Sequence, residues 1–214
     1  GFRKGAAFAL KPAVDEALKG EHNVEKVLVV KRTGQETAWN SATDIWWHEI
    51  VDRQSQEHVA ESFDAEHPLF ILYTSGTTGK PKGVQRDTGG YLVALAASMQ
   101  HIFEGVPGET YFSTSDIGWV VGHSYIVYGP LINRNTTIIF EGKPIKTPDA
   151  STFWRVISEH QVKVMFTAPT AIRAIKKEDP NGEFIKQYDL SCSNKLYVYG
   201  LYTFWIYCYL FSFV

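Results

Sequence analysis

The stretch LFILYTSGTTGKPKGV, residues 69–84, is the part of this sequence that decides its fold. Residues 69–73 form an uncharged, apolar run typical of a buried β-strand. The segment that follows, YTSGTTGKPKGV at residues 73–84, is dense in hydroxyl groups, glycines and lysines. A strand that ends in such a segment is typical of a phosphate-binding loop, because backbone N–H groups can approach an anion closely where side chains are small.

The spacing of this loop differs from that of the common nucleotide-binding loop, which leads directly into a helix through a Gly-Lys-Ser/Thr sequence. Here Pro81 follows Lys80 where the hydroxyl residue should stand. Proline has no N–H, and it pushes the residue before it towards an extended conformation. We therefore expect a clamp that grips phosphate oxygens with backbone N–H groups, hydroxyl groups and the charge of Lys80. The alternative is a polar hairpin turn whose lysines are solvated.

The composition is that of a globular protein with a sizeable core. The 214 residues are 44% hydrophobic and 21% charged, and the formal net charge is −2. This balance gives no electrostatic support to binding of nucleic acid or of an anionic membrane surface. The seven histidines and two cysteines show no spacing typical of a zinc site, so we expect no metal held by protein ligands.

Apolar runs typical of strands alternate with segments of helical period. Strands are expected at residues 27–30, 69–73, 136–140 and 162–166. Helices are expected from Pro12, over residues 44–51 after a cap at Ser41, over residues 92–103, from Asp149 or Ser151 through residue 157, and over residues 170–177 after Pro169. This alternation predicts an α/β fold with a mostly parallel sheet flanked by helices.

Three further stretches follow the loop in the chain: DIGWVVGHSYIVYGPL at 116–131, FEGKPIKTPD at 140–149 and FTAPTAIRAI at 166–175. Together with the loop they resemble the adenylate-forming (AMP-binding) acyl-CoA synthetases, and among them the short-chain branch of acetyl- and propionyl-CoA synthetases. The resemblance covers about residues 2–191. Two details are closest to the propionyl-CoA synthetase-like branch. One is Val121, where acetyl-CoA synthetases usually have threonine, and the other is the run QRD at 85–87.

The resemblance implies a fold and a reaction. The fold is part of the large N-terminal domain of an adenylate-forming enzyme. Enzymes of the family join a carboxylate to ATP, which gives an acyl-adenylate and pyrophosphate, and CoA then attacks the adenylate to give acyl-CoA and AMP. We therefore expect ATP with Mg²⁺, CoA and a short carboxylate (propionate or acetate) as partners, and neither nucleic acid nor a membrane. The choice between propionate and acetate stays open, because one methylene is worth only about 1–3 kcal/mol in such a pocket.

The resemblance also assigns site residues. The expected ligands of the β- and γ-phosphates of ATP are Thr74, Ser75, Gly76, Thr77, Thr78, Gly79 and Lys80. Trp119, Val120 and Val121 are expected to form the wall of the acyl pocket, and Ala168 part of the tunnel for the pantetheine arm of CoA. These assignments have simpler structural alternatives: the wall residues could be core side chains, and Ala168 could belong to a tight turn between strand and helix.

Several motifs of the family are not found in these 214 residues. They include the glycine-rich loop that contacts the adenine, the ribose-binding aspartate, and the C-terminal domain with the adenylation lysine. Residues 1–191 are therefore expected to be a partial AMP-binding domain, and the chain is expected to be an incomplete, inactive fragment without a catalytic residue for adenylation. The alternative is a non-catalytic truncated isoform that binds nucleotide weakly or associates with a partner.

Residues 192–214 match no motif of the family and are expected to be a divergent aromatic tail. Residues 196–214, LYVYGLYTFWIYCYLFSFV, carry no charge. A helix of that length, at about 1.5 Å per residue, would just span a bilayer core of about 30 Å. Its β-forming composition and the absence of a basic flank argue against a membrane span. By resemblance to the propionyl-type branch, the mitochondrial matrix is the expected location, with the cytosol as the alternative.

Overall fold

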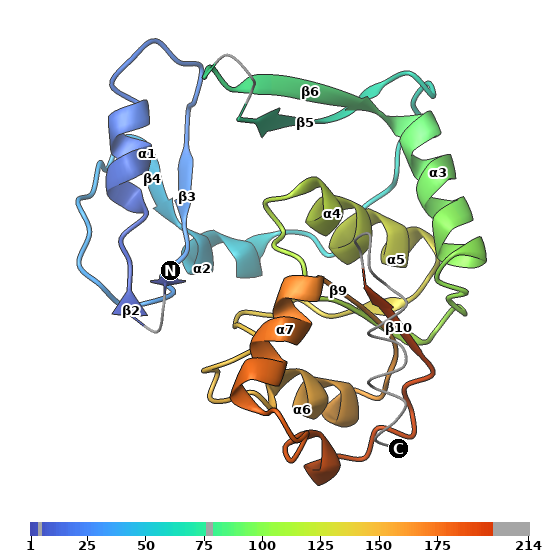
Figure 1. The fold of residues 1–214 in the computed structure, drawn as a ribbon. Coiled ribbons are helices and arrows are strands. Elements are labelled where there is room, and N and C mark those ends of the chain that lie inside the picture. Colours follow the sequence, from blue (N-terminus) through green and yellow to red (C-terminus); the bar gives the residue numbers. More distant parts are fainter. Residues whose placement is uncertain (4–5, 76–78, 199–214) are drawn as a thin grey trace. The chain divides into compact units, whose positions relative to one another are not determined.

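A computed structural model describes residues 1–3, 6–75 and 79–198 of the chain. The chain divides into two compact units, Gly1–Ser62 and Phe63–Val214, and each is described by itself. Figure 1 labels the helices and strands of both.

The first unit is built from short elements. β1 (Phe2–Arg3) pairs antiparallel with β2 (Ala6–Ala7), and β3 (Val27–Val29) pairs in parallel with β4 (Asp44–Trp46). The helices are α1 (Lys11–Ala17), α2 (Trp47–Ile50) and the 3-10 turn η1 (Val51–Arg53). As predicted, Pro12 lies in the first turn of α1, where its missing N–H has no partner to lose.

The predicted helix over residues 44–51 is wrong in its first half, because Asp44–Trp46 form strand β4 and the helix begins only at Trp47. Asp44 does not support a helix start. Its carboxylate instead accepts the N–H of Asn40 at 2.8 Å and contacts the Nζ of Lys11 at 2.8 Å. The backbone of Asp44–Trp46 pairs in parallel with β3.

The second unit begins with a β-hairpin. β5 (Pro68–Thr74) confirms the predicted strand, and it pairs antiparallel with β6 (Lys82–Asp87). α3 (Thr88–His101) follows directly. Its start is set by Asp87, whose carboxylate accepts the N–H of Gly90 at 2.8 Å, an N-cap that satisfies one of the free donors of the first turn. The helix therefore begins four residues before the apolar pattern at 92–103.

A four-stranded parallel sheet forms the centre of the second unit, in the order β10–β9–β7–β8. Its strands are β7 (Thr110–Ser113), β8 (Thr136–Thr137), β9 (Val162–Thr167) and β10 (Lys195–Val198). The strand predicted at 136–140 is confirmed only for its first two residues. The predicted α/β fold with a parallel sheet flanked by helices is confirmed.

Helices cover both faces of this sheet (Figure 1). α6 (Thr152–Glu159) and α7 (Pro169–Glu178) lie on one face. α3 lies on the other, together with a continuous helical segment made of α4 (Val120–Gly122), the π-helical η2 (His123–Tyr128) and α5 (Gly129–Ile132). A short 3-10 turn, η3 (Ile185–Gln187), precedes β10.

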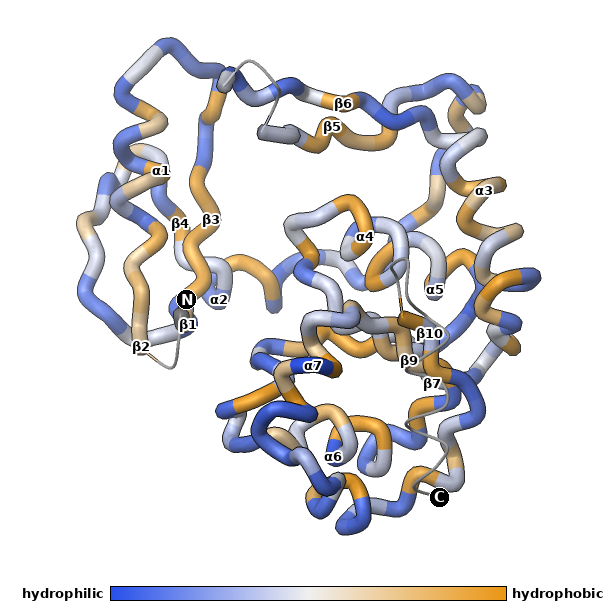
Figure 2. Tube along the Cα trace, viewed as in Figure 1, coloured by the Kyte–Doolittle hydropathy of each residue, from blue (hydrophilic) through white to orange (hydrophobic). Residues whose placement is uncertain are grey.

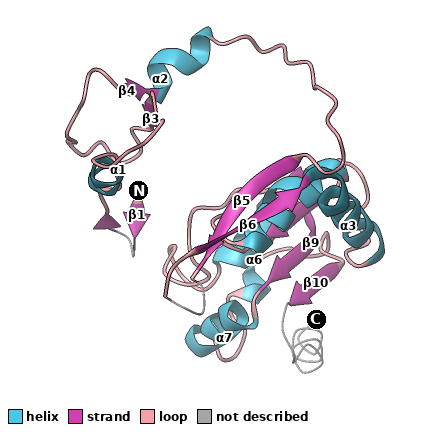
Figure 3. Ribbon diagram, turned by 90° about the horizontal axis from the view of Figure 1, so that it is seen from above, coloured by secondary structure: helices cyan, strands magenta, loops and turns pink. Residues whose placement is uncertain are grey.

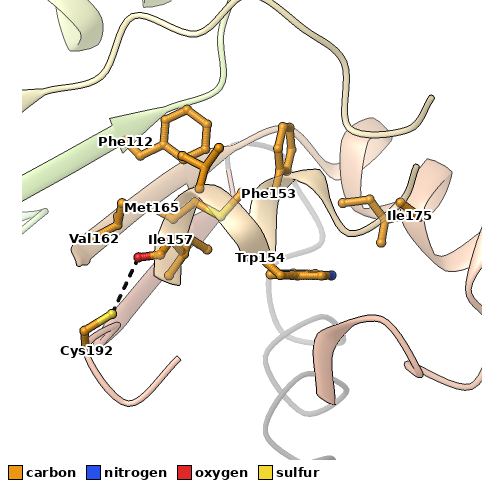
Figure 4. Close-up of a cluster of buried hydrophobic side chains, with 10 residues drawn as sticks. Phe112, Phe153, Trp154, Ile157, Val162, Met165, Ile175 and Cys192 are labelled. Carbon is orange, nitrogen blue, oxygen red and sulfur yellow. Dashed lines mark hydrogen bonds between the residues drawn. The ribbon is translucent and has the colours of Figure 1, made fainter. Parts of the chain in front are cut away.

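Side chains of alternate strand residues enter two separate core clusters, as the pleat of a strand requires. Phe112 and Met165 belong to the cluster with α6, whereas their neighbours Tyr111 and Val164 belong to the cluster with α3. Figure 4 shows the first cluster, in which the Cys192 thiol donates to the carbonyl oxygen of Ile157 at 3.7 Å. Apolar residues accordingly gather along these strands in Figure 2.

β10 lies within the segment that was predicted to diverge from the family, and it pairs in parallel with β9. Residues 199–214, most of the aromatic tail, lie outside the described residues, so the predicted boundary at residue 191 stays a prediction. In the part of the chain that the structure describes, no helix combines the length and the apolar character needed to cross a bilayer.

Candidate functional site

The predicted phosphate loop is the turn of the β5–β6 hairpin. Thr74 is the last residue of β5 and pairs with Lys82, the first residue of β6, so the two ends of the loop are held side by side. Ser75, Gly79 and the exposed Lys80 lie between them. Of the predicted phosphate ligands, residues 76–78 lie outside the described residues. A strand and not a helix follows the loop, as the proline after Lys80 predicts.

Gly79, one of the described residues of this loop, has a backbone conformation that requires glycine. Its φ angle is +78°, in the left-handed region that side chains rarely tolerate. A Cβ atom built there would meet nothing within 4 Å, so the requirement is one of backbone conformation and not of space. A left-handed residue re-aims the N–H groups around it, and such turns make concave sites for anions.

The hairpin is attached to the helices of the second unit through four rings: Phe70, Tyr91, His123 and Tyr128, here called the aromatic anchor. The ring of Phe70, on β5, lies 5.3 Å from Tyr91, 5.0 Å from His123 and 5.7 Å from Tyr128, measured between centroids. The hydroxyl groups of Tyr91 and Ser124 lie 2.7 Å apart, and burial raises the pKa of Tyr91 although this hydrogen bond opposes the shift. The anchor therefore joins the strand before the phosphate loop to α3 and to the π-helix.

A cavity of about 560 Å³ lies where the parallel strands β7 and β9 end. It is lined by residues that follow one or other strand and by one proline of the connecting loop: Thr114, Ser115, Asp116, Trp119, Val121, Pro144, Ala168, Thr170 and Ala171. Two of the predicted wall residues, Trp119 and Val121, thus line the same cavity as the predicted tunnel residue Ala168. Val120, the third, is not among the lining residues, and its side chain is 40% exposed.

The polar residues of this cavity are not among the site residues predicted from the sequence; they are Thr114, Ser115, Asp116 and Thr170. The signal that could have found them is their place directly after β7 and β9. In open parallel sheets, ligands bind at the carboxyl ends of the strands. The two strand ends are tied together there, because the hydroxyl oxygens of Thr114 and Thr167 lie 2.7 Å apart.

The cavity has the composition of a small-molecule site. Its lining combines the apolar side chains of Trp119, Val121 and Ala168 with a few hydroxyl groups and one carboxylate, and such a mixture binds an apolar group while it orients a polar one. Among the described residues, no group of three or more histidine, cysteine, aspartate or glutamate side chains is arranged to hold a metal ion.

A second cavity, of about 390 Å³, lies within the first unit. Its lining runs along α1 and β3 and includes Phe8, Leu10, Val29 and Trp46. None of the residues predicted from the sequence to bind substrate lines it. The cavity at the strand ends of the second unit is therefore the candidate site.

Comparison with known proteins identifies the family of this chain. The model of the AMP-binding enzyme family matches residues 4–200. An acetyl-coenzyme A synthetase of Streptomyces avermitilis is 54% identical over 178 residues, which are 83% of this chain and 27% of that protein. The human acyl-CoA synthetase short-chain family member 3, mitochondrial, is 49% identical over 202 residues, or 94% of this chain and 29% of that protein.

An acetyl-coenzyme A synthetase of Escherichia coli is 50% identical over 180 residues, and this chain again covers only 28% of it. The chain thus spans between a quarter and a third of the length of these relatives. The match of the family model extends over most of the chain and includes the hairpin and the cavity. The chain therefore belongs to the family of AMP-binding enzymes, and its resemblance to the short-chain acyl-CoA synthetases is confirmed.

Proposed function

We propose that this chain supplies the phosphate loop and the acyl pocket of an acid–thiol ligase, which converts a short carboxylate to its CoA thioester through an acyl-adenylate. The observation that carries the proposal is the shared cavity: Trp119 and Val121, expected at the acyl group, and Ala168, expected at the thiol end of CoA, line one space. The two substrates that form the thioester would have to meet in such a space.

The hairpin loop would hold the β- and γ-phosphates of ATP, supplied as its Mg²⁺ complex. Thr74, Ser75 and Lys80 stand at the two ends of the loop and offer hydroxyl groups and one positive charge to phosphate oxygens. Adenylation needs the carboxylate in line with the α-phosphate and the charge of the leaving pyrophosphate neutralised. The loop would neutralise the charge of the leaving pyrophosphate, and the cavity would hold the carboxylate in line with the α-phosphate.

The substrate would be a short carboxylate, propionate or acetate, and CoA would be the acceptor. Val121 gives the wall a methyl group where a threonine would place a hydroxyl, which favours an apolar acyl group. We propose the mitochondrial matrix as the location, supported by the human relative whose name places it in mitochondria, with the cytosol as the alternative. The proposed partners are these small molecules alone.

The test compares two proteins. The 214-residue chain by itself is expected to show no exchange between ATP and labelled pyrophosphate with acetate or propionate, because it covers only 27% of a working relative. A hybrid enzyme, in which this chain replaces the aligned segment of the Streptomyces avermitilis protein, is expected to form acyl-CoA from both acids. Exchange by the chain alone would show that these 214 residues suffice for adenylation, and a folded hybrid enzyme that forms no acyl-CoA would refute the proposed function.

A further inference from the structure

The position of Trp119 in the cavity depends on the backbone and not on side-chain packing. Its side chain is 70% exposed, so few neighbours hold the indole. Its backbone is held on both sides: the N–H of Trp119 donates to the carbonyl oxygen of Asp116 at 3.1 Å, and the carbonyl oxygen accepts the N–H of His123 at 3.0 Å. The turn from Asp116 to Trp119, here called the wall turn, therefore decides where the indole stands.

The side chain of Asp116 adds a second hydrogen bond within this turn. Its Oδ1 atom accepts the N–H of Gly118 at 2.7 Å. A hydrogen bond to a carboxylate is about twice as strong as one between neutral groups. Asp116 thus holds the wall turn with both its side chain and its carbonyl group, and it also lines the cavity beside Trp119.

Gly122 lets the wall turn lie directly on the helix that follows it. A Cβ atom at position 122 would stand 2.1 Å from the carbonyl oxygen of Asp116 and 2.6 Å from the Cα atom of Ile117. Both are backbone atoms, which cannot rotate away as a flexible side chain could. Any residue other than glycine would therefore push the turn off α4.

These contacts set the spacing between two walls of the cavity. Trp119 stands at the end of the wall turn, Val121 stands on α4, and both line the cavity. We propose that Asp116 and Gly122 are positioning residues that fix the distance between Trp119 and Val121, and through it the fit of the short acyl group. The inference rests on the proposed function and adds to it two residues that set substrate fit without holding phosphate.

The alternative role for Asp116 is a direct one, in which its charge acts on a substrate in the cavity. The two roles predict different results for asparagine. Asp116→Asn keeps an oxygen that accepts the N–H of Gly118 but removes the charge, whereas Asp116→Ala removes both. Rescue by asparagine therefore separates positioning from charge.

The first measurement is made in the hybrid enzyme described above. Asp116→Ala is expected to raise the KM for the carboxylate by about tenfold, the effect of losing one charge-assisted hydrogen bond, with the KM for ATP unchanged. Asp116→Asn, which keeps a weaker, uncharged hydrogen bond to the N–H of Gly118, is expected to have a KM for the carboxylate much closer to that of the unsubstituted hybrid enzyme than to that of Asp116→Ala. Gly122→Ala is expected to shift the ratio of kcat/KM values from acetate towards longer acids, because the turn moves away from α4.

The second measurement uses the 214-residue chain itself. Millisecond hydrogen exchange is expected to be faster at the amides of Gly118 and Trp119 in Asp116→Ala, and only slightly faster in Asp116→Asn. This measurement tests whether Asp116 holds the wall turn even where the hybrid enzyme or Gly122→Ala fails to fold. It also separates the two proposals, because its result does not depend on whether the hybrid enzyme is active.

Three results would overturn the inference. One is an exchange rate in Asp116→Ala equal to that of the unsubstituted chain. Another is Asp116→Asn behaving as Asp116→Ala in either measurement, which would assign the effect to charge. The third is an equal rise in the KM for ATP and for the carboxylate, which would mean general loss of structure.

Discussion

The buried carboxylate of Asp44 joins three parts of the first unit. Its side chain is 1% exposed, and it contacts the Nζ of Lys11 from α1 at 2.8 Å and the backbone N–H of Asn40 at 2.8 Å. Burial alone would raise the pKa of Asp44, but the hydrogen bond from Asn40 and the ion pair with Lys11 outweigh it and lower the pKa. Burial alone would lower the pKa of Lys11, but its hydrogen bonds to Asp15 and Asp44 raise it.

These shifts predict a stability plateau for the first unit. An aspartate whose folded pKa is lowered adds stability above its unfolded pKa of about 3.9, and this is lost as the pH falls through the folded value. A lysine whose folded pKa is raised adds stability below about pH 10.4, and this is lost as the pH rises through the folded value. Denaturant unfolding, followed by the fluorescence of the stacked Trp39 and Trp46, should show one loss of stability at acid pH (the acid limb) and another at alkaline pH.

Two variants check the origin of the acid limb. Asp44→Ala should lower the free energy of unfolding near neutral pH by about 2–3 kcal/mol, because it leaves the Asn40 N–H without its acceptor and the Lys11 ammonium with Asp15 as its one remaining carboxylate partner. Asp44→Asn keeps an acceptor for the N–H and should lose less, and its unfolding free energy should not fall through this site as the pH drops below about 3.9. An acid limb of unchanged size in Asp44→Asn would assign it to other carboxylates.

Single residues of the site differ in how far the sequence predicts them. Trp119, Val121 and Ala168 could be singled out as candidates from the sequence because each stands in a recognisable motif of the chain, and all three line the cavity. Thr114 and Thr170 could not, since their role depends on β7 lying next to β9 in the sheet. That neighbour relation is a long-range pairing, which no local pattern of residues contains.

At the level of elements, local chemistry predicts helix starts better than strand partners. The prolines at positions 12 and 169 lie in the first turns of α1 and α7, as their missing N–H groups require. The sequence predicts the short stretch from Asp44 to Trp46 as the start of a helix, but it is a strand, because three residues are too few to tell a helical period from that of a strand. Its pairing with β3, remote in the sequence, decides between them.

The aromatic anchor predicts a link between the hairpin and ATP binding. Phe70 lies on β5, the strand that leads into the phosphate loop, and its ring contacts three rings of α3 and the π-helix. Phe70→Ala in the hybrid enzyme should raise the KM for ATP by about tenfold, because a loop displaced by about 1 Å loses its alignment. The KM for the carboxylate should change less.

Phe70→Leu is the matched control, since it keeps most of the apolar volume and should retain the KM for ATP within a small factor. Circular dichroism and the unfolding midpoint show whether each variant is folded. An unchanged KM for ATP in a folded Phe70→Ala variant would show that the loop keeps its place without the anchor.

On the scale of the whole chain, the two units are joined by a segment without helix or strand. Residues 54–64 are exposed throughout and lie between η1 and β5. Figure 3 draws this connection as a loop without helix or strand. Val59 is 86% exposed and Phe63 is 59% exposed, so neither apolar side chain is packed into a core. Exposed backbone with few contacts opens locally at low cost and is where proteases cut first.

We therefore expect a glutamate-specific protease to cut the folded chain first after Glu57 or Glu61, and to release two fragments that match the two units. Glutamates within helices, such as Glu159 in α6, should be cut much later, because cleavage there requires the backbone to unfold. Mass spectrometry of early time points identifies the cut. The double variant Glu57→Gln/Glu61→Gln should delay this first cleavage, whereas early cleavage inside β5–β10 would mean that the second unit does not hold together in solution.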